Sequence, residues 1–369
     1  MRALGIINFE GKNVKVRGMD NHRPLAAFSF LGRYRLIDIM ISNMTNSGIE
    51  HIQVYMNGET RSLIEHLASA QQYNINSKTG RLQLLTKNPL DLDIYNHDIN
   101  AFLYNLEAIE ESNAEYVVIA PSFIVYPLDF RKVWEFHQAQ QADITIVYKN
   151  VSDAKEHYLL CDTLQVDEQQ RVVRRTINDA RNKNRDVSLE AYVMKKELFV
   201  SLIKQAPNIS RVYWLKDIIA DNLEHLKVLA YRYKKDCHFI CSLADYYQVN
   251  MILKDYDTAK ELFHKDWPIY TRTNDTAPAY YASSAVVKQS IVANGTVIRG
   301  TVENSIIGRQ VKVETGAVVK DCVVLPGSYI GKDVHVSYAV IDKKARLENV
   351  KDLGGSANNI LYIKRKDLI

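Results

Sequence analysis

The last quarter of the chain is dominated by short aliphatic runs at a hexapeptide period, and this repeat restricts the fold more than any other feature. From Ala285 onwards, runs of Val, Ile or Ala return every five or six positions, with Gly and small polar residues between them. Such a period is typical of a parallel β-helix, in which each coil buries its aliphatic side chains against the next. We predict a left-handed parallel β-helix over residues 281–369; a small antiparallel β domain is the alternative.

Upstream of the repeat, apolar strands alternate with amphipathic helices. This order predicts βαβ units and a doubly wound, mostly parallel sheet in an α/β domain of residues 1–240. A helix from Ala244 to about His264 is expected to open a linker of residues 241–280. The expected strands of the domain are residues 4–8, 51–56, 116–120, 143–149 and 187–194, with an antiparallel excursion at 159–166 and 172–177, and the expected helices are 60–68, 129–140 and 214–223.

Composition excludes several classes of function. The chain has 47 basic and 43 acidic residues, a net charge of +4, which is too balanced to indicate a nucleic-acid partner. No apolar run approaches the ~18 residues of a membrane span, so we expect a cytoplasmic protein without membrane contact. Cys237, His238 and Cys241 are close in sequence, but a structural zinc needs four ligands and no second pair is suitably spaced. No metal is expected there.

Residues 34–48 have the three- and four-residue apolar spacing of a buried helix, ending at Gly48. Four small polar residues interrupt this pattern: Asp38, Ser42, Asn43 and Asn46. Such a row indicates either a helix face that borders a cleft or an ordinary solvated face, and spacing alone does not decide between them.

The segment 22–49 resembles the signature of ADP-glucose pyrophosphorylases, K-P-A-V-P-x-G-G-x-Y-R-L-I-D-x-x-L-S-N-x-x-N-S-G-I. Members of this family make ADP-glucose from ATP and glucose-1-phosphate, end in a β-helix and assemble as tetramers. The resemblance therefore implies the same two-part fold as the residue pattern, and it covers essentially the whole chain. The matching residues are Gly32, Tyr34, Arg35, Leu36, Ile37, Asp38, Ser42, Asn43, Asn46, Ser47, Gly48 and Ile49.

The resemblance also shows which family motifs are missing. Active members follow the first strand with G-G-x-G-T-R-L, whose glycines let the backbone approach phosphate. Here the strand runs into Phe9, Glu10 and Gly11, and no register restores the double glycine. A second motif, G-T-A-D-A, becomes a stretch around Asp98 in which only the alanine survives.

Two family carboxylates implied to bind magnesium are also replaced. In L-x-G-D-H the aspartate position is occupied by Phe123, and in D-F-G it is occupied by Tyr213. A phenyl ring offers no oxygen ligand, and magnesium accepts little else. The degenerate positions of the former active site are therefore Phe9, Gly11, Asp98, Phe123 and Tyr213, and we predict no catalytic residue in this chain.

Kept scaffold motifs and lost chemical motifs together resemble the GlgD-type regulatory subunits of this family. That resemblance implies a chain with little or no activity that modulates a catalytic ADP-glucose pyrophosphorylase subunit, as a heterotetramer. It implies that this chain binds no cofactor and that magnesium belongs to the catalytic partner. The opening L-G-I-I-N and the R-P-L-A at residues 23–26 are typical of these subunits.

Basic residues near the N-terminus are candidates for binding an effector. Family effectors are sugar phosphates that bind near the equivalent region, which implies effector binding or subunit coupling by Arg17, Arg23, Arg33 and Arg35. A second basic run at 171–185 is interspersed with Asp179, and a solvated hairpin is the preferred interpretation.

Two other functions are weighed against this interpretation. An active enzyme with an altered site would need substitute carboxylates or bases, for which His97, Asp98 and Asp91 are candidates. A β-helix acyltransferase would use a solenoid histidine, and His335 is the only one in the repeat. Phe123 argues against the first function, and a lone histidine is weak support for the second.

Overall fold

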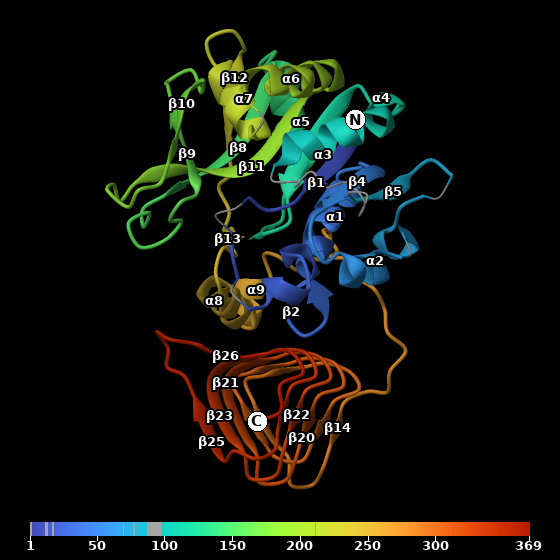
Figure 1. Cartoon of the computed structure of the whole chain (residues 1–369), viewed down its shortest axis with the longest axis vertical. Coiled ribbons are helices and arrows are strands. Elements are labelled where there is room, and N and C mark those ends of the chain that lie inside the picture. Colours follow the sequence, from blue (N-terminus) through green and yellow to red (C-terminus); the bar gives the residue numbers. More distant parts are fainter. Residues whose placement is uncertain are drawn as a thin grey trace. The chain divides into compact units, whose positions relative to one another are not determined.

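The computed structural model describes residues 2–11, 14–16, 18–68, 70–76, 78–86, 97–210 and 212–369. The chain divides into two compact units, each assembled from separate stretches of sequence (Figure 1). The unit that we call the α/β unit comprises Met1–Asn13, Ile39–Phe239 and Trp267–Tyr270. The unit that we call the β-helix unit comprises Val14–Asp38, Ile240–Asp266 and Thr271–Ile369.

The sheet of the α/β unit has the strand order β10-β9-β11-β6-β1-β4-β5, and β8 and β12 extend it from β11. The central strands β6, β1, β4 and β5 run parallel, whereas β11 lies antiparallel to β6 and β8. The strands are β1 Ala3–Asn8, β4 His51–Met56, β5 Arg81–Thr86, β6 Tyr116–Pro121, β8 Ile144–Val151, β9 Asp162–Val166, β10 Val172–Ile177, β11 Arg185–Lys195 and β12 Val228–Arg232.

Helices cover both faces of this sheet. Leu4 and Ile6 of β1 face a buried core that includes residues of α3 (Asp98–Tyr104), α6 (Lys196–Ile209) and α7 (Leu215–Asp221). Gly5, between them, faces the opposite side, where an added Cβ would lie 2.7 Å from Met44 Sδ. The predicted doubly wound α/β fold is confirmed. The remaining helices described in this unit are α2 Arg61–Leu67, α4 Leu106–Glu110 and α5 Phe130–Ala139, and α1 Leu36–Asn46 continues into it.

Several expected element boundaries were wrong by two residues or more, and the largest differences concern residues 34–36, 159–162 and 244–264. The helix expected from Tyr34 begins at Leu36, because Tyr34–Arg35 form strand β3, which pairs with β2 (Ser29–Phe30). The single helix expected over residues 244–264 is two helices, α8 (Leu243–Leu253) and α9 (Tyr256–Ala259). Strand β9 begins at residue 162 rather than 159, because two preceding residues have positive φ angles.

The β-helix unit stacks short parallel strands into coils, which Figure 1 draws in orange and red. One sheet has the order β14-β17-β20-β22-β24, and the other strands pair in parallel around β21 and β23. Ile307 pairs with Val324, and Val324 with Ile341, so equivalent aliphatic residues of successive coils lie side by side in the core. The left-handed β-helix is confirmed. Its strands are β14 Tyr280–Tyr281, β15 Val286–Lys288, β16 Ile291–Val292, β17 Val297–Ile298, β18 Thr301–Glu303, β19 Ile306–Ile307, β20 Lys312–Val313, β21 Val318–Val324, β22 Tyr329–Ile330, β23 His335–Ile341, β24 Arg346–Leu347, β25 Asp352–Gly354 and β26 Leu361–Ile363.

Sequence segments outside the repeat complete the β-helix unit. Tyr247 of α8 donates its hydroxyl to the Asp321 carbonyl at 2.9 Å, and the Leu31 amide donates to Asn250 Oδ1 at 3.0 Å. Arg23 Nη2 lies 2.5 Å from Oδ1 of Asp342, the residue that directly follows β23. The coils are therefore contacted by α8 and by Arg23. In the described parts of the chain, no helix is both long and apolar enough to cross a membrane.

Candidate functional site

The carboxyl ends of β1 and β6 meet at one edge of the sheet, where Asn8 is paired with Pro121. Carboxyl edges of this kind are where open α/β sheets bind ligands. Phe9 directly follows β1, is only 8% exposed, and packs edge-on against Trp214 with ring centroids 5.9 Å apart. Trp214 is also the nearest neighbour of Gly11, at 4.0 Å from an added Cβ. The loop after β1 is thus covered by aromatic rings.

Asp98 lies at the same edge but acts as a structural link. It is the first residue of α3, and its carboxylate accepts from Asn8 Nδ2 and from the Leu215 amide, both at 2.9 Å. Complete burial raises its pKa to about 7, although these hydrogen bonds and Lys216 act in the opposite direction. Asp98 therefore joins β1, α3 and α7. His97 is buried beside it, and Asp91 lies outside the described residues.

Phe123 lies in an aromatic cluster that sequence reasoning did not anticipate. It is 2% exposed, and its ring centroid is 6.4 Å from that of Phe239. Phe239 belongs to β13 (His238–Phe239), which pairs antiparallel with β7 (Ile124–Val125). Tyr158 packs on Phe239 from another side at 5.1 Å. No sequence motif marks Phe239, because only the β7–β13 pairing brings it to Phe123, and Tyr158 joins the cluster through Phe239.

A network of ion pairs neutralises the cations of the neighbouring strands and α7. Lys216 Nζ lies 2.5 Å from Asp162 Oδ2 and 3.5 Å from Glu190 Oε1, while Arg175 binds Asp162 at 2.6 Å and also Asp217. Burial lowers the pKa of Lys216, but Glu190 and Asp162 outweigh it, and the net pKa is raised. The cavity beside Lys216 and Arg175 holds only about 10 Å³, no more than one water molecule.

Three polar side chains of α1, those of Asp38, Ser42 and Asn43, are fully buried, and that of Asn46 is half-buried. Ser42 Oγ accepts from the Tyr270 amide at 2.8 Å, and Asn46 Nδ2 donates to the Pro268 carbonyl at 2.9 Å. Asn43 accepts from Trp267 Nε1 at 2.9 Å and donates to the Tyr126 carbonyl. Asp38 accepts from the Thr271 hydroxyl at 2.6 Å. The interpretation as an ordinary solvated face was wrong for Asp38, Ser42 and Asn43, because these buried residues hydrogen-bond residues 267–271.

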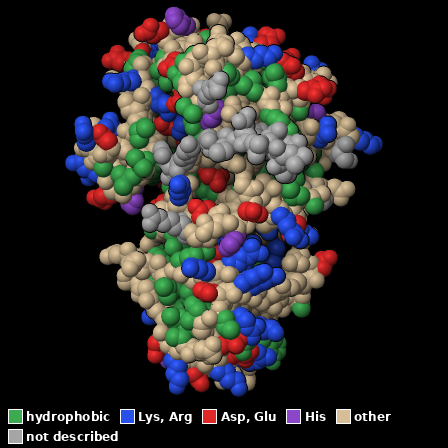
Figure 2. All heavy atoms as spheres, in the orientation of Figure 1, with side chains coloured by type: hydrophobic (Ala, Val, Ile, Leu, Met, Phe, Trp, Pro, Cys, Tyr) green, Lys and Arg blue, Asp and Glu red, His purple; other side chains and the backbone are tan. Residues whose placement is uncertain are grey.

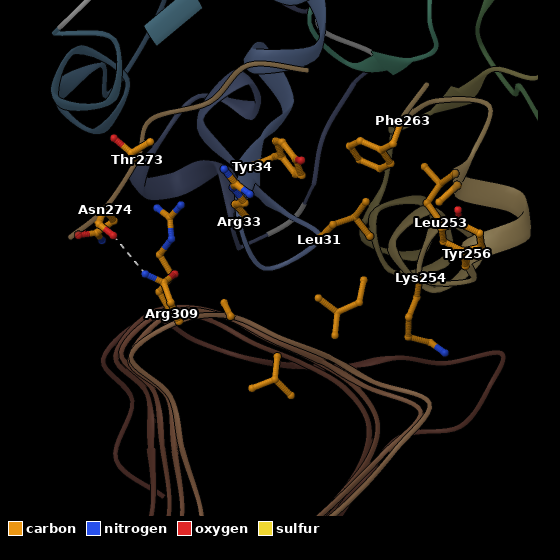
Figure 3. Close-up of a pocket in the computed structure, with 15 residues that line it drawn as sticks. Leu31, Arg33, Tyr34, Leu253, Lys254, Tyr256, Phe263, Thr273, Asn274 and Arg309 are labelled. Atoms are coloured by element: carbon orange, nitrogen blue, oxygen red, sulfur yellow. Dashed lines mark hydrogen bonds between the residues drawn. The ribbon is translucent and has the colours of Figure 1, made fainter. Parts of the chain in front are cut away.

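A cavity of about 670 Å³ opens within the β-helix unit (Figure 3). Its walls are mostly apolar, and its cations come from three elements. Arg33 and Arg309 lie on one side of it, and Lys254 lies on the other. Burial, and then Arg33 and Arg272, lower the pKa of Arg309. Among the described residues the buried Nε of Arg309 has no hydrogen-bond partner. The cavity is therefore electrostatically suited to an anion. Its apolar lining is Leu31, Tyr34, Leu253, Tyr256, Ala259, Phe263, Ile291, Val292 and Ala293.

Comparison with known proteins places the chain in a family. The model described as nucleotidyl transferase matches residues 5–255, and the model described as GlmU-like, C-terminal hexapeptide matches residues 278–359. The glycogen biosynthesis protein GlgD of Geobacillus stearothermophilus is 30% identical over 86% of this chain and 83% of its own length. This chain belongs to the ADP-glucose pyrophosphorylase family of nucleotidyl transferases.

Two glucose-1-phosphate adenylyltransferases are similar over comparable lengths. That of Bacillus anthracis is 25% identical over 94% of this chain and 93% of its own length. That of Geobacillus stearothermophilus is 26% identical over 86% of this chain and 83% of its own length. The similarity to ADP-glucose pyrophosphorylases therefore extends across both units.

Magnesium, which the ADP-glucose pyrophosphorylase family implies, does not fit the side chains at this edge. Magnesium binds oxygen ligands in near-octahedral geometry, whereas Phe123 and Phe239 present only carbon. The Tyr213 hydroxyl, the only oxygen of that side chain, donates a hydrogen bond to Asp221. Within the described residues, no three His, Cys, Asp or Glu side chains are grouped to hold a metal ion, and this includes Cys237, His238 and Cys241.

The candidate effector residues fall in different environments. Arg23 is 2% exposed and is used in its ion pair with Asp342, whereas Arg33 is exposed at the cavity. Burial, then Arg35 and Arg23, lower the pKa of Lys343 to about 6, so positive charge is crowded here. Figure 2 shows Lys and Arg side chains gathered on the β-helix unit. Arg17 lies outside the described residues.

Proposed function

We propose that this chain is a non-catalytic or weakly active regulatory subunit of a hetero-oligomeric ADP-glucose pyrophosphorylase. In this proposal it serves glycogen biosynthesis in the cytoplasm, in a heterotetramer with a catalytic subunit that it modulates. The observation that carries the proposal is Phe123 packed against Phe239 at the carboxyl edge of the sheet. The names of the relatives supply the pathway and the reaction.

The chemistry of nucleotidyl transfer explains why this aromatic pair is decisive. Transfer to a phosphate oxygen builds up negative charge that metal ions and basic groups stabilise. Losing several kcal/mol of that stabilisation slows the reaction tenfold for each ~1.4 kcal/mol. Among the described residues, Lys216 and Arg175, the cations of α7 and β10, are already neutralised by Asp162, Glu190 and Asp217. These two cations are then not free to stabilise that charge, and the described carboxylates form no group that could hold a metal ion.

The proposal is tested in a mixed complex whose catalytic subunit is inactivated at its own metal-binding aspartate. That complex should make no ADP-glucose, whereas the complex with the intact catalytic subunit should be active and should differ in rate or effector response from the catalytic subunit alone. ADP-glucose synthesis by the complex with the inactivated partner would show that this chain carries out the reaction itself.

A second candidate function, an active adenylyltransferase with an altered site, has one observation in its favour. Asp98 is buried with a pKa raised to about 7, and Glu190 lies close enough to influence it. Perturbed carboxylates of this kind occur at catalytic sites. If Asp98 is catalytic, Asp98→Asn should abolish a measurable activity of the isolated chain. If Asp98 is a structural link, the same change should lower thermal stability only.

The same proposal includes a sugar-phosphate effector, and the Arg33 cavity is the place that fits it best. A phosphate between Arg33 and Arg309 would relieve the repulsion that lowers the pKa of Arg309. The aromatic and aliphatic walls would cover one face of the sugar. Arg33→Ala should weaken the effector response of the mixed complex at least severalfold. Lys312→Ala, an exposed cation on β20, is the matched control and should leave that response unchanged.

A further inference from the structure

A second cleft lies in the α/β unit, on the outer side of the edge strand β12. It has a volume of about 470 Å³, within the range of small-molecule sites, and lies between α5 and residues 231–235. It shares no lining residue with the Arg33 cavity, and neither Phe9 nor Phe123 borders it. We call it the α5–β12 cleft. Its lining residues are Pro127, Leu128, Asp129, Lys132, Phe136, Gln170, Tyr231, Arg232, Tyr233, Lys234 and Lys235.

Aromatic side chains form one wall of this cleft and are held in place. Phe136 of α5 packs edge-on against Tyr231 of β12, with ring centroids 5.4 Å apart. Tyr233 donates its hydroxyl to the Pro127 carbonyl at 2.9 Å, which joins the two sides of the cleft. Tyr231 is half-buried, so part of its ring remains accessible. A fixed, partly open aromatic wall of this kind suits a flat ring.

Four exposed cations line the cleft: Lys132, Arg232, Lys234 and Lys235. In the described part of the chain none of their side chains makes an ion pair or a hydrogen bond. Of the neighbouring acids, Asp129 is already engaged, because both of its oxygens bind Arg131, at 2.8 and 2.9 Å, whereas Glu135 of α5 acts electrostatically on Tyr231. Asp236, which follows Lys235, pairs with Lys149 at 3.3 Å. The four cations outnumber the neighbouring acids Asp129, Glu135 and Asp236, so the cleft keeps a net positive charge.

Taken together, the geometry points to an accessory site for a nucleoside phosphate. We propose that its phosphates are bound by Lys132, Arg232, Lys234 and Lys235, and that its base packs on the wall formed by Tyr231 and Phe136. Gln170, from the turn between β9 and β10, supplies an amide that can hydrogen-bond the edge of the base. Lysine and arginine groups on several sides suit a flexible anion with more than one charge. The site does not depend on the proposed regulatory role.

The test measures binding of ADP to the purified full-length chain by calorimetry, with tripolyphosphate and adenosine as probes of the two halves of the ligand. The chain should bind ADP saturably, and Lys132→Ala with Lys234→Ala should weaken ADP binding at least tenfold. Tyr231→Leu should weaken ADP binding while leaving tripolyphosphate binding unchanged. Lys195→Ala is the matched control and should have no effect on ADP binding. This exposed lysine does not line the cleft and pairs with Tyr116, the first residue of β6.

Several outcomes would overturn the inference. Absence of saturable ADP binding, or ADP binding that ignores the double lysine change, would exclude the site. Equal binding of tripolyphosphate and ADP, together with no effect of Tyr231→Leu, would leave a polyanion patch without base recognition. ADP binding that is lost in Asn8→Ala but kept in the double lysine variant would place the nucleotide at the carboxyl edge of β1 instead.

Discussion

Breaking the ion pair between Arg23 and Asp342 should destabilise the β-helix unit strongly. Both side chains are buried, at 2% and 0% exposure, and the two charged atoms lie 2.5 Å apart. Asp342 also accepts from the Tyr362 hydroxyl at 2.8 Å and from the Lys343 amide at 2.6 Å. Arg23→Met removes the countercharge and leaves the carboxylate buried with these two neutral donors only.

The expected cost is near the lower end of the range for an orphaned buried charge, about 3 kcal/mol. Arg23 also lies over the Phe28 ring, at 5.3 Å from its centroid, and losing this contact adds about 0.5 kcal/mol. Lys343 reduces the total, because removing Arg23 relieves part of the repulsion that depresses its pKa. A charged Lys343 can then partly neutralise Asp342.

Hydrogen exchange of the β23 and β26 amides reports on this region directly, because both strands flank Asp342. Arg23→Met should lower their opening free energy by about 3 kcal/mol. The double variant Arg23→Met with Asp342→Asn should lose clearly less than the sum of the two single changes. A single variant within about 0.5 kcal/mol of wild type, the size of an ordinary surface change, would refute the structural role of Arg23 and restore it as an effector contact.

Two further predictions concern the buried side chains Lys343 and Phe123, and a third concerns the β-helix. Lys343→Met should stabilise the protein by about 2 kcal/mol at pH 7, a value discounted for the partial exposure of the lysine. The folded protein holds this lysine at a pKa near 6, so the wild-type fold loses stability as pH falls from about 10.5, the unfolded pKa, to 6. Melting temperatures of the two proteins should therefore converge toward pH 10. Phe123→Asp should not restore ADP-glucose synthesis in an enzyme assay or tight magnesium binding in calorimetry. The aromatic rings of Phe239 and Tyr158 would surround the new carboxylate, and burying it there costs about 2 kcal/mol or more. Removal of residues 281–369 should give an aggregating product in size-exclusion chromatography, since Arg23 and Tyr247 lose their partners Asp342 and Asp321; a well-behaved monomer would contradict this.

Local patterns in the sequence predicted the fold class because they report on burial directly. The continuous apolar run around Leu4 and Ile6 and the hexapeptide period that includes Ile307 and Val324 both follow from the burial of these strands. Helix ends were predicted less well. The break between α8 and α9 depends on Asp255, whose carboxylate caps Thr258, and this capping interaction lies within a run that looks helical.

The candidate sites were predictable only where a residue type alone carries the argument. Phe123 has no oxygen to offer a metal ion wherever it lies, so the prediction that this position cannot bind magnesium did not depend on the fold. Arg23 and Arg33 are indistinguishable in sequence, yet one is buried against Asp342 and the other lines a cavity. Asp342 and Arg309 are hundreds of residues away from them, and no local pattern indicates these partners.

ADP-glucose synthesis by the purified chain alone tests the central claim most directly. The measurement follows pyrophosphate release from ATP and glucose-1-phosphate in saturating magnesium, with a catalytic relative as the positive control. The aromatic cluster of Phe123, Phe239 and Tyr158 predicts a rate indistinguishable from the reaction without protein. Turnover of about 1 per second or faster, in the range of ordinary enzymes, would contradict it and show that this edge of the sheet still carries out nucleotidyl transfer.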